Sequence, residues 1–398
     1  MQYSDLATPE FLKNPYPVFE AMRAEGQLVK LAPKLYATSH YAFGEKLLLD
    51  RRFGKGIVEA VKARYGEGVI DQPPFRTFRS MLPGLNPPKH TNLRALLMKS
   101  FNARQVEKFR EASYTISNQL IDKLVKEPQG DLVTGFAFLL PMQTMCTILG
   151  VPLSDGAMFK RAADRAAGAL NVTPLNAEQL EESRKSAIEL ETYFAKVLAE
   201  RRKEPGDDLI SQMILAEEDG QRLTDDEIVA NLCFLFVAGH ETTENMIGNT
   251  LIALQHHPEQ RERVKADLSI MPKVVTEALR YDSSVQIAQR VALEEVELEG
   301  QTIQRGDLIC VFLGGGNRDP EKFENPNALD IDRENVRPLS FGGGLHYCLG
   351  ARLALLEIAA ALETVYTRLP NLHLTNLDAL PYRRNNALRG VDSLLGTW

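Results

Sequence analysis

The sequence predicts a mainly helical protein with a smaller β-rich part, and three observations lead to this expectation. Apolar residues recur at helical spacing over most of the chain before residue 290. Short apolar runs bounded by turn residues are concentrated after it. The chain shows no internal repeat, no low-complexity segment and no linker rich in Pro, Gly or Ser, which favours a single domain over residues 1–398.

The first predicted elements are short. Pro15–Glu25 reads as an amphipathic helix, and residues 28–31 and 35–38 read as a pair of strands. Longer segments with helical periodicity follow, and they are residues 89–101, 104–126 and 178–203.

The longest predicted helix begins at Thr224, which forms a capping-box pattern with Glu227, and runs to about His257. Its first half is strongly apolar at Ile228, Val229 and Leu232–Val237, which predicts burial in the middle of a large protein. The segment Ala238-Gly239-His240-Glu241-Thr242-Thr243 follows. Glycine, an acid and hydroxyl groups are costly inside a buried helix. This segment is therefore either a solvent-facing turn or a place where a ligand meets the helix.

The β-rich part follows residue 290. Val296–Leu298 and Thr302–Ile303 flank a Glu299–Gly300 turn and predict a hairpin. Leu308–Leu313 is a further apolar run with the length of a strand. A last helix is expected from about residue 350 to residue 368, directly after a glycine-rich loop.

Composition excludes several classes of protein. With 46 Lys and Arg against 53 Asp and Glu the net charge is −7, which argues against nucleic acid as the main partner. The four cysteines are scattered without a C-x-x-C pair, so neither a disulfide framework nor a multi-cysteine zinc site is expected. Residues Met1–Gly26 contain no apolar run with the length of a signal peptide or a membrane span. We expect a cytoplasmic protein.

The glycine-rich loop Phe341-Gly342-Gly343-Gly344-Leu345-His346-Tyr347-Cys348-Leu349-Gly350 is the most informative motif. It lacks the Lys-Ser/Thr of a phosphate-binding loop and the serine of a nucleophile elbow. What remains is Cys348 at the start of a helix, where the helix dipole favours a thiolate that can act as a nucleophile or a metal ligand. Cys146, Cys233 and Cys310 are expected to be core residues.

Three other patterns are weak when taken alone. His240-Glu241-Thr242-Thr243-Glu244 lacks the second histidine of H-E-x-x-H, which excludes zinc peptidase chemistry. Glu277 and Arg280 share one helix face, and so do His90 and Arg94. Either pair is also compatible with a solvated surface.

Together, in this order along the chain, these motifs resemble those of the cytochrome P-450 family. Phe341–Gly350 matches the family signature F-G-x-G-x-H-x-C-x-G, and Ala238–Thr243 matches A-G-x-E-T-T. Gly316–Pro320 resembles A-N-R-D-P, and Asn14–Pro17 resembles the family's N-terminal entry segment. The resemblance covers essentially the whole chain. It implies the cytochrome P-450 fold, with a haem between the long central helix and the helix that follows the cysteine loop.

The resemblance also implies a cofactor and its contacts. Cys348 would be the axial thiolate ligand of a haem b (iron protoporphyrin IX). The other family positions that contact the haem correspond to His90, Arg94, Ala238, Gly239, Arg290, Phe341, Gly342, His346 and Gly350. Glu277, Arg280 and Arg333 would form a structural triad that supports the haem pocket.

The implied activity is monooxygenation, the insertion of one oxygen atom of O2 into a hydrophobic small molecule by hydroxylation or epoxidation. Glu241 and Thr242 match the family's acid–alcohol pair, which relays protons to dioxygen. Electrons would come from a separate ferredoxin-type partner. The alternatives on the same fold are a haem-based sensor or carrier without turnover, and a peroxide-driven or coupling oxidase. We expect a monomer.

Two groups of surface and pocket residues complete the predictions. Cationic residues that could meet an acidic ferredoxin, or could be ordinary surface charges, are Lys89, Lys99, Arg104 and Arg352. Candidate walls of an apolar substrate pocket, each of which could equally be core packing, are Leu82, Leu85, Leu235, Ala238, Val285, Ile287, Ala288, Ala387 and Leu388.

Overall fold

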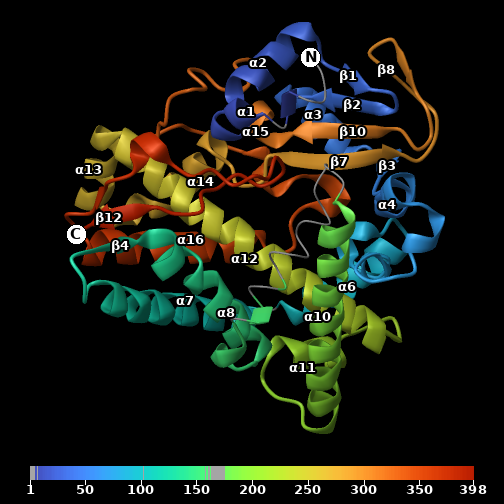
Figure 1. Cartoon of the computed structure of the whole chain (residues 1–398), viewed down its shortest axis with the longest axis horizontal. Coiled ribbons are helices and arrows are strands. Elements are labelled where there is room, and N and C mark those ends of the chain that lie inside the picture. The colour runs from blue at the N-terminus through green and yellow to red at the C-terminus, as the bar shows by residue number, and fades with distance from the viewer. Residues whose placement is uncertain (1–4, 7, 102, 157, 160–161, 163–174) are drawn as a thin grey trace. The chain divides into compact units, whose positions relative to one another are not determined.

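The computed structural model describes residues 5–6, 8–101, 103–156, 158–159, 162 and 175–398. Helices predominate and the strands are short (Figure 1), as the sequence predicted. The chain divides into two compact units. The first comprises Met1–Gly54, Ser113–Pro141 and Glu241–Trp398, and the second comprises Lys55–Ala112 and Met142–His240. The units interleave along the sequence, so no single cut separates them, and one domain over residues 1–398 stays a prediction.

The first unit contains a five-stranded sheet with the order β1-β2-β10-β7-β3. β10 runs parallel to β2 and antiparallel to β7, and Figure 1 shows these strands side by side. The bounds of the strands are β1 (Val29–Ala32), β2 (Leu35–Thr38), β3 (Phe53–Gly54), β7 (Ile287–Ala292) and β10 (Leu308–Phe312). The predicted strand pair is therefore confirmed, and the run from Leu308 forms a strand beside it in the same sheet.

Alternation along β10 supplies both faces of this sheet with core residues. Ile309 and Val311 lie in the cluster that includes residues of α3 (Tyr41–Leu49). Cys310 and Phe312 lie in the cluster that includes residues of α1 (Pro9–Lys13) and α2 (Tyr16–Glu25). Both faces are thus covered by apolar side chains from the N-terminal helices.

The remaining elements of the first unit are helices and two small sheets. The predicted hairpin is present as β8 and β9, with Glu299 and Gly300 at φ 48° and 70° in the turn. The bounds of these remaining elements are β4 (Gln129–Asp131), α13 (Pro258–Ala266), α14 (Met271–Tyr281), β8 (Val296–Leu298), β9 (Gln301–Ile303), α15 (Leu313–Gly316), α16 (Ala351–Arg368), β11 (His373–Leu374) and β12 (Leu395–Thr397).

The second unit is almost entirely helical. Phe159 stacks on Phe194 of α10 (Ala177–Lys203) and lies 4.3 Å, centroid to centroid, from Phe236 of α12 (Asp225–His256), so aromatic packing joins these helices. The elements of this unit are α4 (Ile57–Tyr65), α5 (Phe75–Phe78), α6 (Lys89–Ser100), α10 (Ala177–Lys203), α11 (Leu209–Leu215), β5 (Glu217–Glu218) and β6 (Gln221–Arg222).

Three helices contribute residues to both units, and they are α7 (Ala103–Leu124), α8 (Leu139–Leu149) and α12 (Asp225–His256). The start of α12 is fixed by the predicted capping box. Glu227 N–H donates to Thr224 Oγ1 at 3.2 Å, and Thr224 N–H donates to Glu227 Oε2 at 2.9 Å. The helix has 32 residues, as the sequence indicated. None of the helices in the described part of the chain is long and apolar enough to cross a membrane.

Candidate functional site

The cysteine loop lies in the first unit and joins a short 3₁₀ helix, Leu339–Phe341, to the start of α16. Cys348 N–H donates to the carbonyl of Phe341 at 3.0 Å, which closes the loop. Gly344 has φ 65°, and a Cβ at this position would collide with the carbonyl oxygen of Leu48. The loop therefore needs glycine there. Cys348 is exposed, whereas Cys146, Cys233 and Cys310 are buried, which confirms them as core residues.

The loop is anchored by side chains that precede it. Asn317 Oδ1 accepts the N–H of Leu339 at 2.7 Å, and Asn317 Nδ2 donates to Ser340 Oγ at 3.0 Å. Ser340 Oγ donates in turn to the carbonyl of Leu279 on α14 at 2.7 Å. Asn317, Ser340 and Leu279 are buried. The motifs did not single out Asn317 or Ser340, although Asn317 lies inside the segment that resembles A-N-R-D-P.

Glu277 and Arg280 on α14 form a buried bidentate pair, with Nε–Oε2 and Nη2–Oε1 distances of 2.8 and 2.7 Å. Arg333 Nε lies 3.4 Å from Glu277 Oε1, so the three residues that the resemblance grouped are close together. Arg280 also donates to the carbonyl of Asn317 at 3.1 Å. The pair is thereby connected to the residue that holds the cysteine loop.

Arg290 on β7 is 3% exposed, and its guanidinium donates to the carbonyls of Gln289 and Gly343. Gly343 belongs to the cysteine loop. Burial lowers the pKa of Arg290 to about 10. In the part of the chain that the structure describes, no carboxylate forms an ion pair with this guanidinium. A buried cation of this kind is suited to an anionic ligand, since burying a charge without a partner is costly.

His90 and Arg94 lie on α6 in the second unit, and His90 is buried. Burial, followed by the positive charges of Arg94 and Lys55, lowers the pKa of His90 to about 4. Arg94 and Lys55 place positive charge near His90, and positive charge favours an anionic partner. The chain before α6 is held by Asn231 of α12, which accepts the N–H of Leu82 at 2.9 Å and donates to the carbonyl of Ser80 at 3.0 Å.

The middle of α12 carries the remaining predicted site residues. Ala238, Gly239, Glu241 and Thr242 are all half-buried rather than exposed, which does not fit a solvent-facing turn. Gly239 faces Met145, whose sulfur would lie 3.2 Å from an added Cβ. The boundary between the two units falls after His240, so Glu241 and Thr242 belong to the first unit with Cys348.

Glu241 has an ionic neighbour that the sequence did not indicate. Arg383 Nη1 lies 3.6 Å from Glu241 Oε1. The same guanidinium contacts Glu244 and Asp392. Burial alone would lower the pKa of Arg383, but the carboxylates of Glu244, Glu241 and Asp392 raise it above its usual value. The arginine therefore stays charged beside the acid of α12.

The candidate pocket residues fall into two groups. Val285 pairs with Leu388 in an isolated β-bridge, and Gln286 N–H donates to the carbonyl of Ala387 at 2.8 Å. These residues, with Ile287 and Ala288 on β7, belong to the first unit, in which Ile287, Ala288, Ala387 and Leu388 are half-buried. Leu82, Leu85, Leu235 and Ala238 belong to the second unit.

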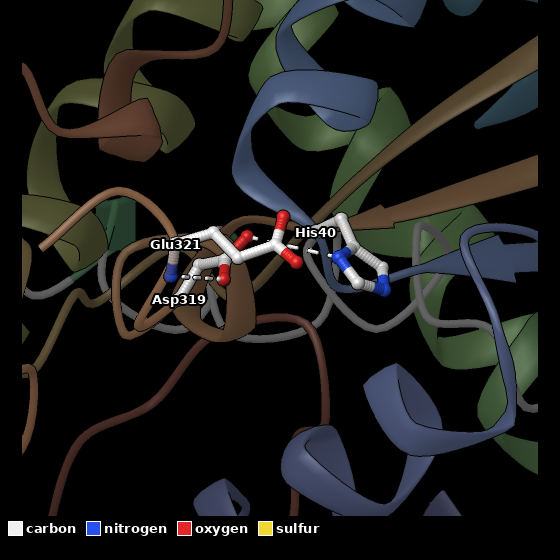
Figure 2. A group of neighbouring side chains, drawn as sticks. All are labelled: His40, Asp319 and Glu321. Carbon is white, nitrogen blue, oxygen red and sulfur yellow. Dashed lines mark hydrogen bonds and ion pairs between the residues drawn. The ribbon is translucent and has the colours of Figure 1, made fainter.

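A third group of polar side chains, His40, Asp319 and Glu321, gathers at the start of α3 (Figure 2). Asp319 Oδ2 accepts the N–H of Tyr41 at 2.8 Å, and Oδ1 accepts the N–H of Glu321 at 3.0 Å. His40 Nδ1 is 3.8 Å from Asp319 Oδ2. Both carboxylate oxygens thus already accept backbone N–H groups. We assign Asp319 to capping α3 and the turn at Glu321.

Comparison with known proteins identifies the family. The sequence profile of the cytochrome P450 family matches residues 58–369. The chain is a cytochrome P450. Among similar proteins, the Xylella fastidiosa P450 designated 133B1 is 44% identical over 99% of this chain and 98% of its own length. The vitamin D(3) 25-hydroxylase of Pseudonocardia autotrophica is 33% identical over 98% of this chain and 95% of its own length.

Solved structures show that the fold is that of the P450 family. P450BioI, crystallised with an acyl carrier protein ligated to hexadec-9Z-enoic acid, matches with a TM-score of 0.91 and 31% identity, over 98% of this chain and 99% of the other. CYP267B1, crystallised with myristic acid, matches with a TM-score of 0.89 and 31% identity, over 99% of both chains. The predicted fold class is confirmed.

Membership of the family makes this P450 a monooxygenase with a haem–thiolate cofactor. The residues present fit that group. Cys348 offers an exposed sulfur at the start of α16, where a thiolate is favoured. Within the first unit, the buried guanidinium of Arg290 beside the cysteine loop suits a carboxylate of haem b.

Proposed function

We propose that this P450 transfers one oxygen atom from O2 into a hydrophobic small molecule, by hydroxylation or epoxidation, as a cytoplasmic monomer. The reaction consumes one O2, two electrons and two protons, places one oxygen in the substrate and releases the other as water. The observation that carries the proposal is the acid–alcohol pair Glu241 and Thr242, half-buried in the middle of α12. A peroxide-driven enzyme or a sensor has no need for such a proton relay.

The haem supplies the oxygen-activating chemistry when bound, with Cys348 as its thiolate ligand. Arg290, His346, His90 and Arg94 would hold its carboxylates, and Phe341 and Gly342 would support it from the cysteine loop. Thr242 would hold a water in the relay through its hydroxyl, and Glu241 would exchange protons with that water. Glu277 and Arg280 would act on the fold, through Asn317 and the cysteine loop.

An apolar substrate is supported by the candidate walls. Ile287, Ala288, Ala387 and Leu388 are half-buried and aliphatic in the first unit, which suits a hydrophobic ligand. Relatives of this chain were crystallised with myristic acid and with testosterone. These two compounds are therefore suitable first probes, with binding read from the spin-state shift of the haem spectrum.

We further propose that a ferredoxin delivers the electrons. Lys89 and Arg352 are exposed and offer positive charge to an acidic partner. Lys99 forms an ion pair with Glu218, and Arg104 forms one with Asp207. Surface pairs of this kind contribute little stability, so a partner could displace them. Charge reversal at Arg352 is expected to slow reduction by a plant-type ferredoxin and to leave reduction by dithionite unchanged.

The proton relay can be tested by Thr242→Ala. This variant should keep the haem–thiolate spectrum, because Cys348 is unchanged. Reducing equivalents should be diverted to hydrogen peroxide, because loss of the hydroxyl removes the water that takes part in the proton relay. We expect the peroxide formed per NADPH to rise by about 10-fold, which is less than the full rate contribution of general acid–base catalysis. The measurement is peroxide yield against NADPH oxidised with ferredoxin and its reductase.

Thr243 provides the matched control, because it carries the same side chain one position along the helix and is buried. Thr243→Ala should leave the peroxide yield at the wild-type value. An unchanged yield in Thr242→Ala would contradict the relay. Turnover with peroxide alone that matches turnover with redox partners would instead favour a peroxide-driven oxidase.

A further inference from the structure

Residues 382–391 fold back on themselves near the C-terminus, and we call this segment the C-terminal hairpin. Tyr382 pairs with Val391 in a β-bridge, and Arg383 N–H donates to the carbonyl of Gly390 at 3.0 Å. Between these closing contacts lie Ala387 and Leu388, two candidate walls of the substrate pocket. The hairpin therefore carries pocket residues at its tip and Arg383 at its base.

The hairpin packs directly on the second half of α12. Glu241, Asn245 and Asn249 are spaced four residues apart and so share one face of the helix. Asn249 Nδ2 donates to the carbonyl of Arg389 at 3.1 Å. A Cβ at Gly390 would collide with the amide of Asn245. Glycine at this position thus allows the hairpin backbone to approach the helix face that also bears Glu241.

Arg383 is the ionic contact between the hairpin and that face. Its Nη2 donates to Glu244 Oε1, its Nη1 lies 3.6 Å from Glu241 Oε1, and its Nε lies 3.4 Å from Asp392 Oδ1. We infer that Arg383 is a positioning residue for the relay acid Glu241. Its guanidinium is anchored by Glu244 and holds the Glu241 carboxylate. It thereby links proton delivery to the C-terminal hairpin, which carries the candidate pocket residues. This inference rests on the proposed function of Glu241.

Arg383 contacts Glu244 and Glu241 on α12 at different distances, and the two acids therefore have different roles. Glu244 is 3% exposed and within hydrogen-bonding distance of the guanidinium, so it is the fixed partner. Glu241 is 17% exposed and its contact with the guanidinium is longer than a hydrogen bond, so the arginine acts on it by charge. Because the site is partly buried, this attraction is screened less than between surface groups.

Among the residues that the structure describes, the ion pairs of Arg383 place charged neighbours of Glu241 on two elements. On α12 the neighbour is Glu244, and on the C-terminal hairpin and directly after it the neighbours are Arg383 and, across its guanidinium, Asp392. Removing the arginine takes its positive charge away from these three acids. A carboxylate that loses a positive neighbour keeps its proton to a higher pH. The pH dependence of turnover should then move upward.

The test compares Arg383→Gln with the wild-type haem-loaded enzyme. NADPH oxidation is measured from about pH 5.5 to about pH 9 with a plant-type ferredoxin and its reductase, without added substrate, because dioxygen reduction itself consumes protons. We expect Arg383→Gln to slow the rate at the pH optimum by about 10-fold and to shift the pH profile of NADPH oxidation to higher pH. Glu241→Gln should slow this rate by about 100-fold, which is the lower end of the rate contributions of general acid–base catalysis. Arg383→Lys keeps the charge and should restore the wild-type profile.

Arg389→Gln is the matched control. Arg389 lies in the same hairpin and pairs with a carboxylate at 2.7 Å, but that carboxylate is Asp282 rather than an acid of α12. Arg389→Gln should lower the stability of the protein and leave the pH profile of NADPH oxidation unchanged. If Arg383→Gln and Arg389→Gln behave alike, Arg383 is merely structural and the inference is wrong. If Glu241→Gln itself changes nothing, the proposed relay is wrong instead.

A double-mutant cycle gives a readout that is independent of turnover. Urea unfolding of the haem-loaded protein is compared for Arg383→Gln, Glu241→Gln and the double variant. Interacting groups give non-additive changes in the free energy of unfolding, whereas independent groups add. Non-additivity supports the contact between Arg383 and Glu241. Additivity would show that Arg383 acts on Glu244 alone and would overturn the inference.

Discussion

Cys348→Ala is expected to abolish the strongly red-shifted Soret band that the reduced protein shows with carbon monoxide. A thiolate ligand produces this shift, and a histidine ligand does not. Cys348 is the exposed cysteine, at the start of α16, and the cysteine loop is closed around it by the contact with Phe341. The loss should be complete, since Cys146, Cys233 and Cys310 are buried. The measurement is an absorbance spectrum before and after addition of carbon monoxide.

Cys310→Ala is the matched control for this experiment. Cys310 is buried in the apolar cluster that includes residues of α2, so its loss should cost stability through a small cavity while the red-shifted band remains. A band that survives in Cys348→Ala would remove Cys348 as the ligand. A band of histidine type in the wild-type protein would do the same.

Elements with a strong local signal could be predicted from the sequence. The start of α12 follows from Thr224 and Glu227, because a capping box satisfies backbone donors locally. The β8–β9 hairpin follows from Glu299 and Gly300, which adopt positive φ in the turn. Each of these signals lies within a few residues of the element that it specifies.

Elements that depend on distant partners could not be predicted in this way. β7, Ile287–Ala292, contains Gln289 and Arg290, and its exposure does not alternate. It is a strand because β10 pairs with it on one side and β3 on the other. Its pairing is specified by residues elsewhere in the chain, which a local pattern does not reveal.

The candidate site likewise combines residues that a local motif locates with residues that only the fold brings to it. The cysteine loop and the middle of α12 are continuous motifs, so the sequence alone locates both. Arg383 stands 139 positions from Glu244, and nothing in its own neighbourhood marks it as the partner of that acid. Asn231 is an amide in the otherwise apolar half of α12, and its bond to Leu82 follows only from the fold.

Arg280→Met is expected to destabilise the protein by about 3–5 kcal/mol, because it leaves the carboxylate of Glu277 buried without its bidentate partner. Glu277 is 1% exposed and Arg280 is fully buried. Arg280 also donates to the carbonyls of Asn317, Pro326 and Ala328, which would lose their donor. The free energy of unfolding, from urea titration of the haem-loaded protein, measures this loss.

Arg333→Met separates the buried pair from the wider triad. Arg333 Nε is 3.4 Å from Glu277 and the side chain is more exposed, so its loss leaves the pair on α14 intact and should cost much less. Removing both charges with Glu277→Leu and Arg280→Met should recover part of the loss, since no lone buried charge remains. Equal effects of Arg280→Met and Arg333→Met would contradict this account. Haem loss should follow the same order, because Arg280 reaches the cysteine loop through Asn317.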